Sequence, residues 1–147
     1  QWLYRIYGSF GGIYAAEPQK STSQHVVYWD TNEIRMHWPS EHQLNGTTYD
    51  LELQAITTDP YGRSLGCYAH KAAFVMLFQV GAANSFFDWQ ASADAQTDVA
   101  IDLGLLFTRI AGTSTSVTGY TGTESTPSCK PGFCWYVTNE VATISQE

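Results

Sequence analysis

The stretch EIRMHWPSEHQLNGTTYDLELQ, residues 33–54, decides the fold class. At both of its ends apolar and polar residues alternate with a period of two. Successive side chains of a strand point to opposite faces, so each end predicts a β-strand with one apolar and one polar face. If the two strands are neighbours in a sheet, five polar side chains share a face: Glu33, Arg35, His37, Glu52 and Gln54.

The rest of the chain is also rich in strand signals. β-Branched and aromatic residues predict further strands over residues 3–7, 25–28, 49–57, 72–80, 133–138 and 141–144. Residues 72–80, AAFVMLFQV, are apolar almost throughout, which is typical of a central strand covered on both faces. Residues 91–110 predict one or two short helices, and the Thr-, Ser- and Gly-rich residues 112–126 predict a loop. We therefore predict a mainly β fold with minor α.

Length and composition predict one globular domain that does not bind nucleic acid and has no membrane span of its own. The chain has 147 residues, of which 44% are hydrophobic, so it is long and apolar enough to bury a core. Its net charge is −7, and no Lys/Arg cluster is present that would neutralise phosphates, which excludes nucleic acid. The longest apolar run, residues 72–78, is too short to span a bilayer.

The polar face of the two strands has two interpretations. It can meet water, as in many antiparallel sheets, or it can line a buried site. The connection Trp38-Pro39-Ser40-Glu41-His42, followed by Glu52-Leu53-Gln54, resembles the α-class carbonic anhydrases, where a His-x-His strand leads through a Ser-Glu-His turn to a Glu-x-His strand. Residues 74–81, 120–129, 134–137 and 141–147 resemble that family's central strand, Thr-Thr-Pro-Pro-Cys loop, buried Trp strand and following segment.

The resemblance implies a single, partial carbonic-anhydrase-like domain over residues 1–147, with a central twisted, mostly antiparallel sheet. It covers about residues 25–147 and leaves residues 1–24 unplaced. The family's outer strands are not recognisable at either end, so the sheet is expected to be truncated at both ends. Unpaired strand edges favour pairing with another chain, so we expect other proteins of a larger assembly as partners.

The resemblance also implies that the family's zinc ion is lost. Its three histidine ligands fall on Arg35, His37 and Gln54, so one histidine is retained. Arginine has no lone pair to offer and a glutamine oxygen is a poor ligand for zinc, so we expect no metal and no cofactor. Our hypothesis is that Arg35 replaces the ion electrostatically by pairing with nearby carboxylates: Glu33, Glu52 and Glu41.

Other site residues follow from the same resemblance. Glu41 and Ser125 correspond to a Glu that orients a Thr hydroxyl beside the zinc, although a structural role explains them equally well. Glu33, Glu52 and His42 surround the ligand positions. The former substrate pocket falls on Ile56, Ala73, Glu124 and Trp135. Glu124 replaces an apolar residue there, which makes the pocket unsuitable for carbon dioxide.

Three cysteines and one N-glycosylation sequon indicate in which compartment the protein is found. A Cys129–Cys134 bridge would close a short loop and leave Cys67 unpaired or paired elsewhere. Asn45-Gly46-Thr47 is an N-glycosylation sequon, and Asn45-Gly46 is also typical of a type I′ hairpin turn. Both features, with the family resemblance, favour a secreted, extracellular or organelle-lumen location.

We therefore expect a catalytically inactive carbonic-anhydrase-like domain that serves as a structural or protein-interaction subunit. Two alternatives remain open at this stage. The first is a divergent carbonic anhydrase that holds zinc through His37 with Glu52 or Glu33. The second is a module that binds a small anion, such as bicarbonate or a carboxylate, through Arg35.

Overall fold

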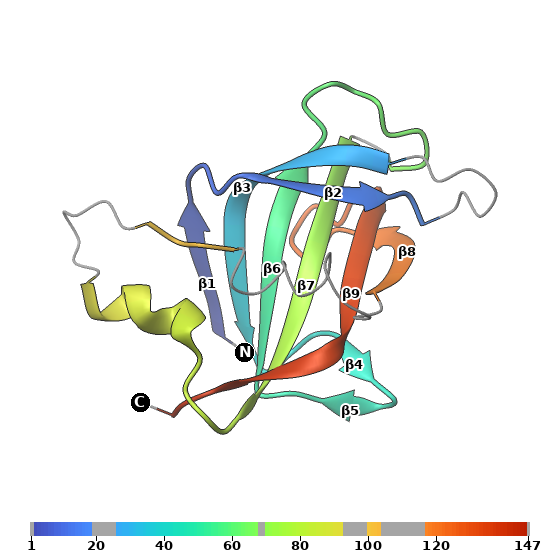
Figure 1. The fold of residues 1–147 in the computed structure, drawn as a ribbon. Helices are drawn as coiled ribbons and strands as arrows, with labels where there is room; N and C mark the ends of the chain where they lie inside the picture. Colours follow the sequence, from blue (N-terminus) through green and yellow to red (C-terminus); the bar gives the residue numbers. More distant parts are fainter. Residues whose placement is uncertain (1, 19–25, 68–69, 93–99, 104–116, 147) are drawn as a thin grey trace.

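The chain forms a seven-stranded twisted sheet in the computed structural model, which describes residues 2–18, 26–67, 70–92, 100–103 and 117–146 (Figure 1). The strands follow the order β1-β3-β6-β7-β9-β8, and β2 pairs with the other half of β3. All neighbouring strands are antiparallel except β7 and β9. The strands of this sheet are β1 (Trp2–Tyr7), β2 (Gly12–Ala16), β3 (Val26–Trp38), β6 (Leu51–Thr58), β7 (Lys71–Val80), β8 (Val117–Thr123) and β9 (Pro131–Ile144). The mainly β prediction is confirmed.

Two pairs of predicted short strands are single long strands. Residues 25–28 and 33–38 were expected to be separate, whereas β3 runs unbroken over Val26–Trp38. A β-bulge between Thr31 and Glu33 absorbs the polar interruption without ending the strand. Residues 133–138 and 141–144 likewise join in β9, which pairs with β7 on both sides of a register shift.

The predicted loop over residues 112–126 is wrong for its second half. Val117–Thr123 forms β8, which pairs antiparallel with the outer edge of β9. The strand predicted over residues 3–7 is confirmed as β1, whereas β2 at residues 12–16 was not predicted; these two strands pair with successive halves of β3. For β2 and β8 a neighbouring strand supplies the hydrogen-bonding partner, so tertiary pairing overrides weak local β-propensity.

Strand β7 is the central strand that the sequence predicted. It lies between β6 and β9, and Ala72 to Phe78 are buried. The sheet has apolar clusters on two faces. The larger includes Trp29, Met36 and Phe78, together with Phe86 and Phe87 of the 3-10 helix η2 (Ser85–Ser92). The helices predicted over residues 91–110 fall mostly outside the described residues.

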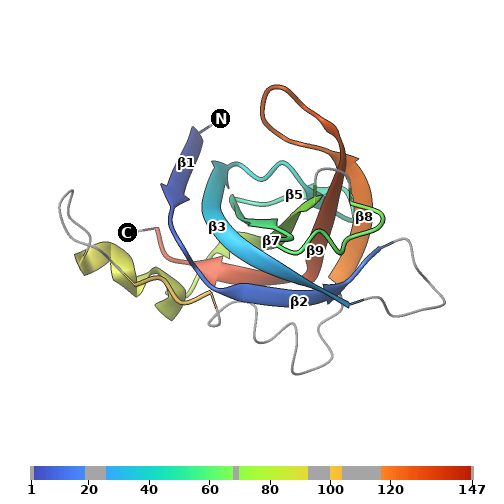
Figure 2. The same ribbon diagram turned by 90° about the horizontal axis from the view of Figure 1, so that it is seen from above.

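A small hairpin connects β3 to β6. Its strands are β4 (Gln43–Leu44) and β5 (Thr47–Thr48), and both turn residues have positive φ: 50° at Asn45 and 77° at Gly46. Positive φ at both central positions defines the type I′ turn that the sequence predicts, and this prediction is confirmed. Figure 2 shows how strongly the main sheet curves, with β1 and β8 standing at its two ends.

The predicted Cys129–Cys134 bridge is wrong. Cys134 is bonded to Cys67, and Cys129 is an exposed free thiol. Strand β9 begins at Pro131, so the extended chain carries Cys134 away from Cys129 and into the larger apolar cluster. There it meets Cys67, whose Cα lies 5.4 Å from that of Cys134, a separation that suits a disulfide. In the part of the chain that the structure describes, no helix is long and apolar enough to cross a membrane.

Candidate functional site

The five polar residues of the opening stretch share one face of the sheet. In the register of β3 and β6, His37 lies opposite Glu52 and Arg35 lies opposite Gln54. All five side chains are buried, including Glu33 at the bulged end of the pairing. The solvated-face alternative is therefore wrong. Burial of so many polar groups requires each to find partners, so the hydrogen bonds of this face decide its chemistry.

Arg35 is paired with Glu33. Its Nε donates to Glu33 Oε1 at 2.7 Å and its Nη2 donates to Oε2 at 3.1 Å, so the guanidinium fork engages both carboxylate oxygens. Arg35 Nη1 also donates to the Thr126 hydroxyl at 3.5 Å, and Arg5 of β1 lies 3.7 Å from the same carboxylate. The hypothesis that Arg35 satisfies a buried carboxylate thus holds for Glu33, whereas the expected pairing with Glu52 is wrong.

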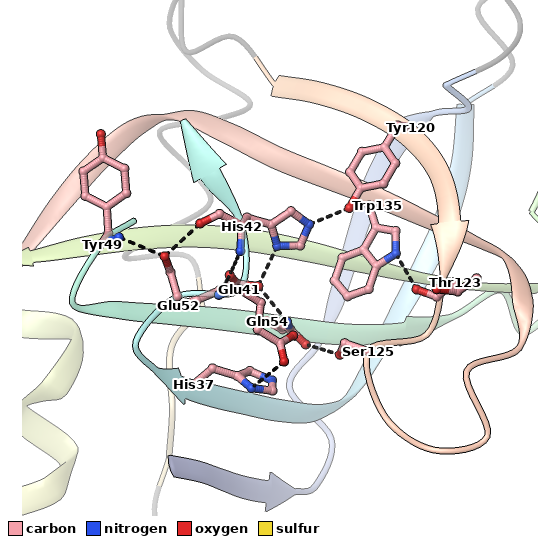
Figure 3. Close-up of polar contacts among 11 residues, drawn as sticks. His37, Glu41, His42, Tyr49, Glu52, Gln54, Tyr120, Thr123, Ser125 and Trp135 are labelled. Carbon is pink, nitrogen blue, oxygen red and sulfur yellow. Dashed lines mark hydrogen bonds and ion pairs between the residues drawn. The ribbon is translucent and has the colours of Figure 1, made fainter. Parts of the chain in front are cut away.

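Glu52 is the centre of a second network, drawn in Figure 3. Its Oε2 accepts hydrogen bonds from the backbone N–H groups of Glu41, at 2.9 Å, and His42, at 2.7 Å. Its Oε1 lies 2.8 Å from His42 Nδ1 and accepts from Gln54 Nε2 at 2.6 Å. A carboxylate only accepts, so His42 Nδ1 is the donor. Four donors therefore converge on one fully buried side chain and tie the turn after β3 to β6.

The network continues through His42 to the edge strand β8. His42 Nε2 lies 2.6 Å from the Tyr120 hydroxyl, and the His42 ring packs against Trp135, with centroids 4.9 Å apart. Burial, together with the negative charges of Glu52 and Glu41, raises the pKa of Tyr120 to about 12. The hydroxyl therefore stays protonated at neutral pH and can donate to His42. Tyr120 was not singled out from the sequence, because the spacing along the chain does not reveal which residue of β8 faces His42.

Glu52 remains ionised in spite of its burial. Desolvation opposes the charge, but the hydrogen bonds from the ring and backbone N–H groups of His42 and from Gln54 lower the pKa of Glu52 below its usual 4.5. A carboxyl whose pKa is lower in the folded state stabilises the fold fully above its unfolded pKa, and this contribution is lost as the pH falls through the folded value. The network should therefore weaken in acid.

We expect this loss to be measurable in urea unfolding from about pH 7 to pH 3. The free energy of unfolding should fall more steeply below about pH 4.5 for the native chain than for Glu52→Gln, so the two curves converge in acid. The Gln side chain keeps the shape but does not titrate. Parallel curves over this range would show that Glu52 does not contribute to the acid sensitivity.

His37 and Gln54 complete the site. His37 Nδ1 lies 3.5 Å from Glu41 Oε1, while its Nε2 is buried without a hydrogen-bond partner. The Gln54 amide is engaged at both ends, since Nε2 donates to Glu52 and Oε1 accepts from the Ser125 hydroxyl at 3.5 Å. The site therefore joins residues of β3, β6 and the segment after β8 that lie up to 91 positions apart in sequence.

The residues predicted for a former substrate pocket lie on the same face. Ile56, Ala73 and Trp135 belong to the smaller apolar cluster, and the Trp135 indole N–H donates to the Thr123 carbonyl at 3.0 Å. Glu124 lies at the margin, with its carboxylate 3.7 Å from Lys71 Nζ. Glu52, Gln54 and Ile56 are alternate residues of β6 and so point to the same face. The polar and the apolar parts of this face therefore meet along β6.

Known proteins resemble this chain in sequence and in fold. The chain is 34% identical to alpha carbonic anhydrase 4 of Arabidopsis thaliana over 122 residues, which make up 80% of this chain and 43% of that protein. The chain is a divergent relative of the α-class carbonic anhydrases. It is also 27% identical to dioscorin dioA3 of Dioscorea japonica, over 85% of this chain and 45% of that protein. The chain spans less than half the length of these relatives, and no family model matches it.

Solved structures confirm the carbonic-anhydrase fold. An α-carbonic anhydrase from Thermovibrio ammonificans in complex with sulfanilamide matches 95% of this chain and 65% of its own, with a TM-score of 0.66 and 22% identity. Dioscorin complexed with ascorbate matches 98% of this chain and 64% of its own, with a TM-score of 0.65 and 23% identity. These similarities establish the fold. The chemistry of the site must be inferred from the residues of this chain.

Arg35, His37 and Gln54, which the sequence resemblance assigns to the ligand positions, do not fit a zinc ion. Arg35 has no lone pair and is held by Glu33, and both ends of the Gln54 amide have protein partners. His37 alone keeps an available nitrogen. Within the described segments no group of three His, Cys, Asp or Glu side chains is arranged to hold a metal. Zinc needs at least three converging protein ligands, which these residues do not supply.

Proposed function

We propose that this chain is a catalytically inactive carbonic-anhydrase-like domain that serves as a structural or protein-interaction subunit of a larger assembly. One observation carries the first half of the proposal: Arg35, which the resemblance assigns to the first ligand position of the family's metal site, forms a bidentate pair with Glu33. A buried pair of this kind supplies a fixed positive charge in place of the ion and leaves no open coordination site. Hydration of carbon dioxide by a zinc-bound hydroxide then has no place to occur.

The alternative of a divergent zinc enzyme lacks available side chains to coordinate the metal. It would need Glu33 or Glu52 beside His37, but both oxygens of Glu33 are held by Arg35 and both oxygens of Glu52 accept hydrogen bonds. Freeing either carboxylate would strand an arginine or several N–H donors in the interior, at a cost of several kcal/mol. This cost favours the inactive interpretation.

Capture of a small anion by Arg35 is also disfavoured. The guanidinium is buried and its charge is already matched by Glu33, so bicarbonate or a carboxylate would have to displace an intramolecular partner. The nearby carboxylates of Glu41 and Glu52 add negative charge to the same face. We expect isothermal titration with bicarbonate to give no binding heat for the native chain or for Arg35→Ala.

Exposed strand edges support the second half of the proposal. Strand β1 ends the strand order on one side of the described sheet, and its Leu3, Tyr4 and Tyr7 side chains are exposed. Unpaired edges with apolar side chains favour addition of a strand from another chain. The Cys67–Cys134 disulfide fits an oxidising compartment, so we place the assembly in a secretory, lumenal or extracellular setting.

The metal half of the proposal is tested by restoring the ligands. We expect the purified native chain to bind far less than one zinc per chain and to lack sulfonamide-sensitive hydration activity. The variant Arg35→His/Gln54→His, with Glu33→Gln to avoid an unpaired buried charge, should bind zinc at one per chain, because three imidazoles then converge. Stoichiometric zinc and sulfonamide-sensitive activity in the native chain would refute the proposal.

The interaction half is tested separately. Added to an extract of its natural source, a tagged copy of this 147-residue chain should elute well above the size of its monomer, and a tagged Leu3→Lys/Tyr7→Lys variant should elute as a monomer. Gln43→Lys on the β4–β5 hairpin is the matched control, since it adds a charge at another exposed position. Monomeric elution of the native chain in that extract would contradict the interaction role.

A further inference from the structure

A hollow lies away from the residues predicted for the former metal site. It is lined by residues of β2, the beginning of β3 and the turn after β6: Tyr14, Val26, Tyr28, Asp59, Tyr61 and Arg63. None of these residues belongs to the Glu33–Arg35 pair or to the Glu52 network. The hollow has a volume of about 470 Å³, within the range of roughly 300–1,000 Å³ found for small-molecule sites. Figure 1 shows β2 and the first half of β3 side by side at the end of the sheet where the chain leaves β6.

Three tyrosine rings form the wall of this hollow. Tyr14 and Tyr28 are cross-strand partners, with ring centroids 5.1 Å apart and an edge-to-face angle of 61°. Tyr28 and Tyr61 follow with centroids 6.1 Å apart. Tyr14 and Tyr61 are 73% and 68% exposed, so large apolar ring faces meet solvent in one place. Clustered exposed aromatic rings are typical of a binding surface rather than of a solvated sheet face.

The backbone holds these rings in place. A Cβ at position 12 would lie 2.1 Å from the Tyr28 ring, so the ring can cross β2 only because residue 12 is glycine. Asp59 is buried, and its carboxylate accepts hydrogen bonds from the backbone N–H groups of Tyr61, at 3.0 Å, and Ser64, at 2.6 Å. These bonds fix the turn that carries Tyr61. The aromatic wall is thus organised before any ligand arrives, which reduces the entropy cost of binding.

The charges around the hollow favour a neutral ligand. The Arg63 guanidinium lies over the Tyr61 ring, 5.8 Å from its centroid, so a cation–π position on this wall is already taken. A cationic ligand would also be repelled by Arg63. An anionic ligand would meet Asp59 in the lining and the net charge of −7 of the whole chain. Apolar ring faces combined with hydroxyl and guanidinium hydrogen-bonding groups match a molecule that has both C–H faces and hydroxyl groups.

We propose that this hollow binds a pyranose unit of an uncharged oligosaccharide. The sugar stacks its C–H face on the exposed rings of Tyr14 and Tyr61, and its hydroxyls bond with Arg63 and the tyrosine hydroxyls. This site is independent of the proposed loss of catalysis, since it shares no residue with the metal site. It would give the inactive domain a carbohydrate ligand in addition to its protein partners.

The proposal is tested by NMR of the full chain with ¹³C-labelled tyrosine. The probes are maltotriose, cellotriose, xylotriose and N,N′,N″-triacetylchitotriose, each at about 10 mM, where a millimolar Kd gives near-saturation. At least one should shift the ring signals of Tyr14, Tyr28 and Tyr61 saturably and leave those of Tyr4 and Tyr7 unchanged. Tyr61→Ala should weaken binding roughly tenfold, because a stacking face is lost, while Tyr61→Phe should retain most of it.

The controls separate stacking from a general loss of structure. Tyr4→Ala removes a comparably exposed ring from β1 and should leave the affinity unchanged. Gly12→Ala should displace the Tyr28 ring and abolish the response, with the melting temperature and circular dichroism reporting whether the chain remains folded. Choline serves as a cationic probe and trigalacturonate as an anionic one. The proposal is overturned if no neutral trisaccharide shifts these signals or if only one of the charged probes binds. It is also overturned if Tyr14→Ala and Tyr61→Ala leave the affinity unchanged.

Discussion

Replacing Glu52 with alanine is expected to lower the free energy of unfolding by about 3–5 kcal/mol. The carboxylate is fully buried and accepts hydrogen bonds from the Glu41 and His42 backbones, the His42 ring and the Gln54 amide. Its removal leaves these donors in the interior without an acceptor, and each stranded donor costs about 1–3 kcal/mol when no water replaces the partner. Urea denaturation at pH 7, with the m-value checked for two-state behaviour, measures the loss.

Glu41→Ala is the matched control for this prediction. Glu41 is a neighbouring glutamate, but the bond to Glu52 uses its backbone N–H, which alanine retains. Its carboxylate is partly exposed and lies 3.5 Å from His37, so we expect a loss of about 1 kcal/mol or less. A loss of stability for Glu52→Ala that is as small as the loss for Glu41→Ala would mean that the buried network adds little to stability.

Removal of the Cys67–Cys134 disulfide is expected to have a comparable effect. The bond closes a loop with a sequence separation of 67, for which the chain-entropy model gives a stabilisation of about 4 kcal/mol. The double variant Cys67→Ala/Cys134→Ala avoids leaving one unpaired buried thiol. Its free energy of unfolding, compared with that of the oxidised native chain, should fall by about this amount.

Cys129 provides the control for the disulfide prediction. Cys129→Ser changes an exposed residue whose thiol is in no disulfide, and it should alter stability by less than about 0.5 kcal/mol. Alkylation of the folded, oxidised chain should modify Cys129 and leave Cys67 and Cys134 unmodified. A peptide that links Cys129 to Cys134 in mass spectrometry would contradict the pairing.

Alternation along residues 33–54 was enough to predict the strands, their common polar face and the type I′ turn. These features depend on local geometry, because side chains alternate along a strand and only certain residues tolerate positive φ. The uniform burial of β7 was predictable for the same reason, since an apolar run without alternation requires cover on both faces. The assignment of Arg35 and Gln54 to replaced ligand positions rests on the resemblance to the carbonic anhydrases and stays a prediction.

Other features required the packed chain. Residues 117–123 carry Thr and Gly that predict a loop, and they form a strand because β9 offers them an edge. The sequence offered Arg35 several carboxylates, and only the side-chain geometry of the folded chain shows that Glu33 binds its guanidinium. Cys67, rather than the nearby Cys129, reaches Cys134 because the sheet brings the segment after β6 beside β9.

The strand-rich fold and the polar face were therefore predictable from the chain alone, because each is encoded in residue type and short-range spacing. The charge pairs, the disulfide and the hollow where tyrosines from β2, β3 and the turn after β6 meet depend on how the chain packs. Such contacts join residues far apart in the chain, and their identity depends on register, bulges and strand order. The same physical reason accounts for the Tyr120–His42 contact that the sequence analysis missed.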